Sequence, residues 1–407
     1  MRLALLVTFA LTYVAISARR LRLLPIGRPA ASLVGACAMV ALGAFAGQHG
    51  LSGDDALRAV EPHTLALLFG MMVIAAGLDD AGFFARVTAL VAERRPSPVA
   101  LVYGVTVGAG LLSAALVNDA VCLLAAPLVA RASRRVGAPL RPTLLALAMG
   151  ANAGSALTLA GNPQNMLVAR LSGITYARYL SRAWLPTLAA LAVTAAVIHL
   201  THRAQLSAPV APEDDGVGDT ERRPALLYAS LLALAGVTVA NLLGAPLAWS
   251  ALCGAAVVIV AARDRAEGLI ARVDVTVLVF FAGLFILVEG LNRTGYPAEA
   301  LARVGAARAR ARWWACSPLG SQVVSNVPLI LLLRPWIAGF DDPERAWTVT
   351  ALVSTLAGGL TILGSVANVI VFERAKHDVG FGAYLRVGLP VTVASTAVAL
   401  ALPRLAG

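Results

Sequence analysis

Long apolar stretches separated by short polar segments run through the whole chain. Stretches 31–47 and 226–243 contain no charged residue and approach the roughly 20 residues that a helix needs to cross a bilayer. The first stretch, 3–18, ends at Arg19 and Arg20 rather than at a small-residue cleavage site, so it predicts a retained helix and not a signal peptide. The pattern therefore predicts an all-α polytopic membrane protein with about ten transmembrane helices.

One apolar run cannot be a simple crossing. The run 99–130 is bounded by arginines on both sides, and the positive-inside rule therefore places both of its ends in the cytoplasm. Asn118 and Asp119 lie in its middle, where a lipid-facing helix would not tolerate them. A re-entrant hairpin over about 98–131, with its tip inside the protein, satisfies both observations.

The chain also repeats itself. Three blocks recur in the same order after 213, 208 and 203 residues, as expected for a duplicated unit with trimmed loops. The blocks pair Gly77 with Gly290, Asn118 with Asn326, and Asn165 with Asn368. Chance self-alignment of an Ala/Leu/Val-rich sequence is the alternative, but it does not explain the paired Gly and Asn positions. An odd number of crossings between equivalent points predicts that the second copy is inverted.

The repeat divides the chain into two units around a polar linker. The first unit spans 1–204, with the hairpin at about 98–131 and a broken helix at about 143–170. The linker, 205–224, is rich in Pro, Asp, Glu and Gly. The second unit spans 225–407, with a second re-entrant hairpin at about 313–337 and a broken helix at about 346–373. Two inverted repeats with discontinuous helices are an architecture of secondary transporters, whose binding site lies near the midplane between the repeats.

Composition and charge agree with a multi-pass protein of the plasma (inner) membrane. Hydrophobic residues make up 59% of the chain and charged residues 14%, with a mean hydropathy of +0.78. The net charge is +11, but the arginines lie in short clusters between apolar segments, which indicates orientation in the membrane rather than a nucleic-acid surface. The four cysteines show no metal-ligand spacing, so we expect no metal site.

Loop charges predict the orientation. The basic segment 19–28 is expected in the cytoplasm and the acidic segment 48–63 outside. Arg170, Arg178 and Arg182 depart from this rule, because they fall in a segment that the same count places outside.

Each half contributes two breaks at membrane depth, a hairpin tip and an interrupted helix. Helix breaks free backbone groups, and helix N-termini attract anions while freed carbonyls coordinate cations. Asn suits such a position because its amide both donates and accepts hydrogen bonds. The candidate binding residues are Asn118, Asp119, Gly161, Asn162, Asn165, Ser325, Asn326, Gly364, Ser365 and Asn368.

Two carboxylates are candidates for proton coupling. A buried Asp119 without a fixed countercharge can load and release a proton as access alternates. The alternative is a structural Asp119 that is hydrogen-bonded to neighbouring backbone. Glu289 has two equal interpretations, a proton carrier or a side chain that reaches the headgroups.

At these breaks the chain resembles the ion transporter superfamily of arsenite-efflux permeases, sodium/proton antiporters, citrate transporters and divalent-anion symporters. The resemblance covers both halves and is carried by Asn118-Asp119 and the segments 161–165, 325–328 and 364–368. It implies a substrate site between two hairpin tips and, for the dicarboxylate branch, a homodimer. The Asn-Asp first tip is more similar to the arsenite permeases and anion permeases than to the sodium symporters.

The sequence therefore predicts a proton-coupled transporter of a small anion or oxyanion such as arsenite or antimonite, with no cofactor. The second hypothesis is a sodium-coupled citrate or dicarboxylate carrier. A membrane-embedded enzyme is a third class, but the sequence has no HExxH or GxSxG motif and its five histidines are not clustered. A structural scaffold has no reason to retain buried polar residues at four matched breaks.

Overall fold

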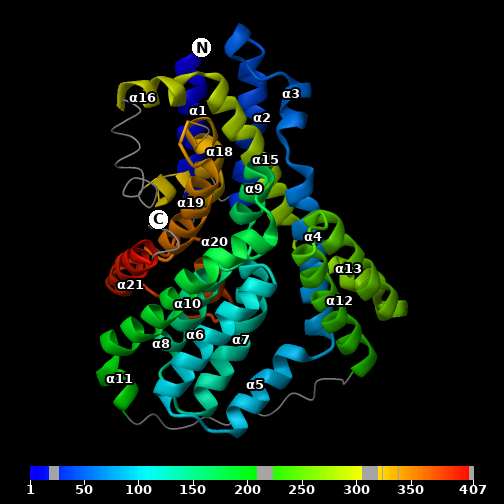
Figure 1. The fold of residues 1–407 in the computed structure, drawn as a ribbon, viewed down its shortest axis with the longest axis vertical. Helices are drawn as coiled ribbons and strands as arrows, with labels where there is room; N and C mark the ends of the chain where they lie inside the picture. Colours follow the sequence, from blue (N-terminus) through cyan, green and yellow to red (C-terminus); the bar gives the residue numbers. More distant parts are fainter. Residues whose placement is uncertain (18–26, 209–222, 305–319, 323, 338, 403–407) are drawn as a thin grey trace.

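The computed structural model describes residues 1–17, 27–208, 223–304, 320–322, 324–337 and 339–402, and within these ranges the chain is helical with no strand (Figure 1). The first half contains α1 (Arg2–Ser17), α2 (Arg28–Gly43), α3 (Gly53–Ala59), α4 (Pro62–Asp80), α5 (Phe83–Glu93), α6 (Pro98–Ala115), α7 (Asn118–Arg135), α8 (Leu140–Ser155), α9 (Pro163–Ser172), α10 (Tyr176–Thr201) and α11 (Arg203–Ser207). The second half contains α12 (Pro224–Leu242), α13 (Leu247–Ala262), α14 (Ala266–Ala271), α15 (Val275–Arg293), α16 (Tyr296–Val304), α18 (Asn326–Ile337), α19 (Pro343–Ala357), α20 (Val366–Arg374) and α21 (Phe381–Ala401).

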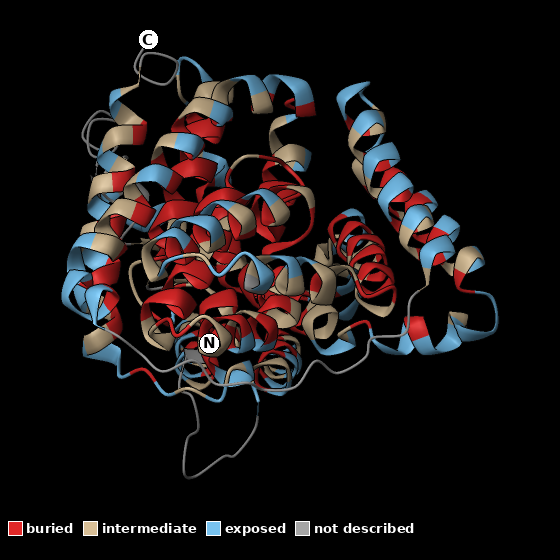
Figure 2. Ribbon diagram, turned by 90° about the horizontal axis from the view of Figure 1, so that it is seen from below, coloured by how far each residue is buried: buried red, intermediate tan, exposed pale blue. Residues whose placement is uncertain are grey.

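The all-α membrane fold is confirmed. Seven helical segments of the described chain are long and apolar enough to cross a bilayer, and α1, α2 and α18 are shorter apolar helices. Buried residues gather in the middle of the bundle, whereas the outer surfaces of the peripheral helices are exposed (Figure 2). In water such apolar surfaces would be costly, but in a bilayer they face hydrocarbon.

The two halves run in opposite directions. Arg2 at the start of α1 donates to the carbonyl of Thr294 at 2.6 Å, whereas Arg223, just before α12, pairs with Asp80 at the end of α4 at 2.9 Å. Likewise, Arg272, just before α15, pairs with Asp80 at 2.9 Å, and Arg293 at the end of α15 pairs with Asp55 of α3, which precedes α4, at 2.8 Å. These contacts place equivalent helices head to tail, which is the relation that an inverted repeat requires.

Each half also completes its packing with the other half. The helix α4 packs on α13, and its equivalent α15 packs on α2. Together with α12, α4 and α13 form a group of helices beside the main bundle (Figure 1). We call the face that carries residues 48–63 and the start of α4 the outer face, following the charge rule.

The hairpins and broken helices lie where the apolar runs are interrupted. The helices α6 and α7 are joined only by Leu116 and Val117, and α7 extends to Arg135, beyond the predicted end of the hairpin. The first broken helix consists of α8 and α9, and the second of α19 and α20. Residues 313–319 of the second predicted hairpin and most of the predicted linker lie outside the described residues.

Two helices occupy the centre of the bundle. Every residue of α8 from Pro142 to Ser155 is buried, and so is every residue of α19 from Ala346 to Ala357. They meet where the Asn152 side chain donates to the carbonyl of Thr355 at 2.7 Å. The breaks that follow these two helices are therefore held deep in the protein, away from lipid.

Candidate functional site

The four breaks meet at one small cavity. Its volume is about 50 Å³, several times the roughly 10–15 Å³ that one water molecule needs. It is lined by Asn118, Asp119, Asn152, Asn162, Pro163, Gln164, Phe280, Phe281, Ser325, Asn326, Val327, Gly364, Ser365 and Val366. Seven of the ten predicted binding residues lie on this list, and no Lys or Arg is among these lining residues. The cavity is therefore polar without being basic.

The first hairpin tip is tied to the first break. The backbone N–H of Asn118 donates to the carbonyl of Gly161 at 3.0 Å, and the Asn118 side chain accepts a hydrogen bond from the N–H of Asp119 at 2.9 Å. Glycine is needed at 161 because an added Cβ would lie 2.3 Å from the carbonyl oxygen of Ser155. Gly161 thus contributes its backbone to the tip and does not line the cavity itself.

Asp119 lies in the first turn of α7 with its carboxylate at the cavity. Among the described residues no hydrogen bond or ion pair reaches this carboxylate, although the charges of Arg28 and Asp274 act on it. The first turn of a helix favours a negative charge, but burial disfavours one. A group held between two such opposing effects can exchange a proton when its surroundings change.

The first broken helix is fastened by side chains. Asn162 caps α9 by accepting from the N–H of Asn165 at 2.9 Å, and its amide nitrogen donates to Ser155 Oγ at 3.1 Å and Thr355 Oγ1 at 3.2 Å. Gln164 donates to Thr355 Oγ1 at 2.5 Å and to Ser354 Oγ at 3.0 Å. The Thr355 hydroxyl of α19 thus accepts hydrogen bonds from two side-chain amides of the first break. Because these two amide nitrogens already donate to protein oxygens, few of their hydrogen-bond donors remain for a substrate.

Asn165 and Asn368 support the breaks from behind, outside the cavity. The amide of Asn165 donates to the carbonyls of Ser155 at 3.3 Å and Thr158 at 3.0 Å. The amide of Asn368 donates to the carbonyls of Gly358 at 2.8 Å and Thr361 at 3.1 Å. Each Asn therefore satisfies carbonyls that the end of the preceding helix leaves free, and the two sets of contacts are equivalent under the repeat.

Several polar groups of the second hairpin tip and the second break make no hydrogen bond among the described residues. Ser325 adopts a left-handed conformation with φ of 60°, which is strained for a residue with a side chain. Asn326 Oδ1 is buried without a hydrogen-bond partner among the described residues. Ser365 precedes α20 but makes no capping hydrogen bond through its side chain. Among the described residues, this half therefore has a polar atom at the cavity that the protein does not pair.

Glu289 lies elsewhere, and its placement does not support the predicted role in proton coupling. It does not line the cavity, and its carboxylate accepts from Arg293 Nε at 3.3 Å. Arg293 in turn bonds Asp55 on the outer face. Arg293 follows Glu289 by four residues in the same helix, so the sequence already contained a signal for this countercharge.

Seven lining residues were not among the predicted binding residues: Asn152, Pro163, Gln164, Phe280, Phe281, Val327 and Val366. Asn152 occupies the position in α8 that Thr355 occupies in α19, 203 residues later, so the repeat contained a signal for it. Gln164 belongs to the first break and was passed over for its neighbours. Phe280 and Phe281 come from the apolar helix α15, where no sequence feature marks the side that faces the cavity.

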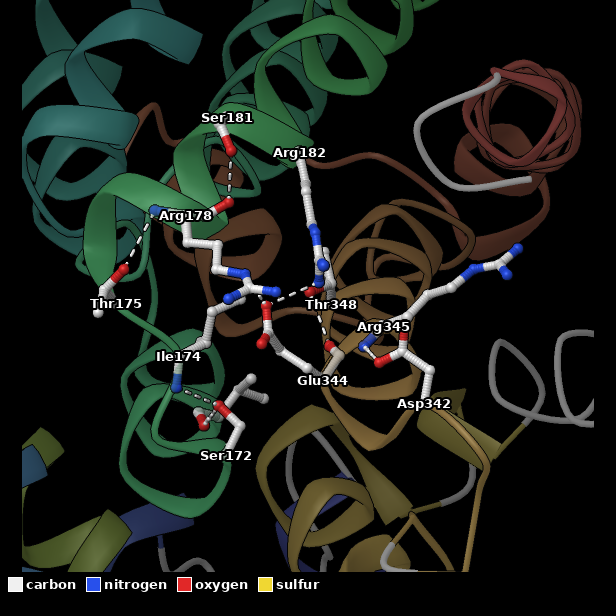
Figure 3. Close-up of polar contacts among 11 residues, drawn as sticks. Ser172, Ile174, Thr175, Arg178, Ser181, Arg182, Asp342, Glu344, Arg345 and Thr348 are labelled. Atoms are coloured by element: carbon white, nitrogen blue, oxygen red, sulfur yellow. Dashed lines mark hydrogen bonds and ion pairs between the residues drawn. The ribbon is translucent and has the colours of Figure 1, made fainter. Parts of the chain in front are cut away.

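The arginines that depart from the charge rule are neutralised by carboxylates of the same face. Arg178 and Arg182 of α10 both reach Glu344 Oε1 of α19, at 2.6 Å and 2.9 Å (Figure 3). Arg170 lies 3.9 Å from Glu61. The clamp of Arg178, Arg182 and Glu344 joins the two halves at the outer face, as Thr355 joins them at the centre.

A model of the citrate transporter family matches residues 13–357. Among curated proteins, the silicon efflux transporter LSI3 of Oryza sativa subsp. japonica is 30% identical, and the alignment covers 93% of this chain and 93% of that protein. The inner membrane protein YbiR of Escherichia coli is 28% identical over 78% of this chain and 81% of that protein. Among solved structures, the YdaH transporter of Alcanivorax borkumensis aligns with a TM-score of 0.54 and 17% identity, over 92% of this chain and 99% of that chain.

Proposed function

The chain belongs to the citrate transporter family, and we propose that this multi-pass membrane transporter moves a small inorganic oxyacid or oxyanion by coupling to protons. Arsenite and antimonite are the first candidate solutes, with efflux across the inner membrane as the direction. The matching family, the silicon efflux transporter LSI3 and the YdaH structure are transporters and not enzymes. The similarity to an inner membrane protein of Escherichia coli supports the choice of membrane.

The observation that carries this proposal is the chemistry of the cavity. Its polar lining consists of amides, hydroxyls and one carboxylate. None of the described residues that line it is Lys or Arg. A citrate trianion in a dry cavity needs cationic partners, because an unpaired buried charge is very costly. Arsenous acid is uncharged at neutral pH and offers three hydroxyl groups, which amides and hydroxyls can both donate to and accept from.

The similarity to a silicon efflux transporter supports the same class of solute. Silicic acid, like arsenous acid, is a small neutral molecule that presents hydroxyl groups around a central atom. A cavity of about 50 Å³ suits such a compact solute.

The proton partner in this proposal is Asp119. Its carboxylate lies among the groups that bind the solute and has no ion pair among the described residues. Protonation neutralises it in a site from which water is largely excluded, so bound solute and bound proton influence each other directly. Coupling then follows from alternating access to a single cavity.

Sodium-coupled transport of citrate or a dicarboxylate is the second candidate, favoured by the description of the matching family. In this alternative the carbonyls freed at the breaks coordinate sodium. In this alternative the bound sodium ions must supply the positive charge that a carboxylate substrate needs, since the described lining residues include no Lys or Arg.

The two candidates separate in proteoliposomes that enclose a pH-sensitive dye. We expect arsenite or antimonite to move protons without sodium, and Asp119→Asn to abolish the signal. Citrate, succinate and sulfate serve as competing solutes, each with and without sodium. If the internal pH does not change while citrate or succinate accumulates only in the presence of sodium, the proposal of proton coupling is wrong. The sodium-coupled symporter then takes its place.

A further inference from the structure

A second and larger cavity opens on the outer face, separate from the cavity of the four breaks. Its volume is about 510 Å³, within the roughly 300–1,000 Å³ of small-molecule sites. It lies between the start of α4, the end of α9 and the turn that joins α12 to α13. No residue lines both cavities.

The inner part of this cavity holds an amide without a partner. Asn241 near the end of α12 is 2% exposed, and its Oδ1 has no hydrogen-bond partner among the described residues. An unsatisfied buried amide costs roughly 1–3 kcal/mol, and a helix inside a membrane has little water to relieve that cost. The amide therefore indicates a bound group that completes its hydrogen bonding.

The mouth of the cavity carries two side chains that can donate hydrogen bonds. His63 and Arg170 line it, and both are exposed. The charged partner of Arg170 is Glu61, whose oxygen lies 3.9 Å from Arg170 Nε, beyond hydrogen-bonding distance. The guanidinium thus keeps its hydrogen-bond donors for a ligand, and a carboxylate is the group that these donors match best.

The wall between the mouth and Asn241 is apolar. Leu67 of α4, Leu159 of the first break and Met166 of α9 line it, and all three are buried. A ligand that reaches from Arg170 to Asn241 must therefore carry an apolar middle, and its burial contributes about 25 cal/mol per Å².

We propose that this outer cavity binds a small organic acid with three parts: a carboxylate at Arg170 and His63, a short apolar chain, and a terminal hydroxyl at Asn241. Such a ligand contacts α4 and the α12–α13 turn on one side and α9 on the other. It therefore bridges the peripheral helices and the first broken helix, and it is a regulator rather than the transported solute.

The test measures binding to the purified full-length protein in detergent by isothermal titration calorimetry. The probes are ω-hydroxycarboxylates of increasing length, such as 6-hydroxyhexanoate. Matched controls lack one end each: hexanoate has no hydroxyl group, and 1,6-hexanediol has no carboxylate. We expect one hydroxy acid of the series to bind at least about tenfold more tightly than its two controls, which is 1.4 kcal/mol or more.

Variants locate the site. Arg170→Gln at the exposed mouth and Asn241→Leu in the buried part should each weaken binding of the hydroxy acid about tenfold. Asn326→Ala, in the cavity of the four breaks, should leave binding unchanged. Equal binding of all three probes, no binding of any hydroxy acid, or binding unaffected by both outer variants would overturn the proposal. Because no transport is measured, the result is independent of the proposed function.

Discussion

The first and second broken helices are related by the repeat, but different hydrogen bonds hold them in place. In the first, Asn162 and Gln164 donate hydrogen bonds to Thr355 of the opposite half. In the second, Ser365 and Ala367 occupy the equivalent positions, 203 residues later, and among the described residues Ser365 makes no capping hydrogen bond through its side chain. The amides of the first break therefore bond the opposite half, whereas the second break is held by Gln322 and Asn368 of its own half.

The hairpin tips continue this difference. The first tip carries Asp119, the single carboxylate among the described lining residues, and the second carries Asn326, whose Oδ1 has no hydrogen-bond partner in the described part of the chain. Both repeats therefore place helix ends at the cavity, but the side chains at these helix ends differ between the repeats. We infer that the first half holds the proton and that the second half supplies more of the contacts to the solute.

The largest expected effect is at the first tip. Asp119→Asn keeps the size and hydrogen-bonding groups of the side chain but removes the titrating group. We expect solute-driven proton movement in proteoliposomes to fall at least about 100-fold, which corresponds to ~2.7 kcal/mol. Asp274→Asn, whose carboxyl acts on Asp119 from a distance, is the control and should retain most of the flux. Full proton movement in Asp119→Asn would contradict the assignment of the first half.

The next effect tests the fastening of the first break. Thr355→Val removes the hydroxyl that receives Asn162 and Gln164 and leaves their buried donors with fewer partners. We expect a loss of about 1–3 kcal/mol in the free energy of unfolding, seen as a lower midpoint of thermal unfolding in detergent.

Thr348→Val is the matched control in the same helix. Its hydroxyl bonds only the carbonyl of Glu344, one turn earlier, so its removal strands no buried amide. If both valine variants lose the same stability, the Thr355 network is not what fastens the break.

A smaller effect is expected at the second tip. Asn326→Ala removes an oxygen that has no partner among the described residues, so stability should change little, whereas solute affinity should fall about tenfold, or 1.4 kcal/mol. Asn118→Ala should show the opposite balance, because Asn118 accepts a hydrogen bond within its own tip. Solute affinity and unfolding measured on both variants would sharpen the comparison, and equal behaviour of the two would remove it.

The smallest effect concerns backbone strain. Ser325 has a positive φ of 60°, which glycine adopts without a steric penalty. We expect Ser325→Gly to raise the free energy of unfolding by less than about 1 kcal/mol, because the steric strain of the serine is removed. A thermal unfolding midpoint well below that of the unmodified protein would show that the serine side chain is required at the tip.

The sequence was sufficient for the breaks and insufficient for the direction of their side chains. Clusters of Gly, Pro and Asn inside apolar runs marked the tips and interrupted helices, because these residues have low helix propensity. Single residues of these types do not suffice, since Pro127 and Pro186 lie inside continuous helices. Whether an Asn faces the cavity or the helix behind it depends on the packing of both halves. Asn165 and Asn368 were therefore predicted to bind the solute, although the structure places them behind the breaks.

The sequence could not identify the residues near the cavity that belong to apolar helices. Phe280, Phe281 and Thr355 lie in segments whose residues are nearly all compatible with a membrane, so periodicity could not single them out. The arginines at 170, 178 and 182 misled for a related reason: their carboxylate partners, Glu61 and Glu344, lie far away in sequence.

The central claim, that Asp119 holds the coupled proton while other residues hold the solute, is tested most directly by counting protons on binding. Arsenite is titrated into the purified protein in two buffers of different ionisation enthalpy, so that the difference in measured heat gives the number of protons exchanged. We predict an exchange of protons in the unmodified protein and none in Asp119→Asn, with arsenite still bound by both. The same proton count in both proteins would contradict the account.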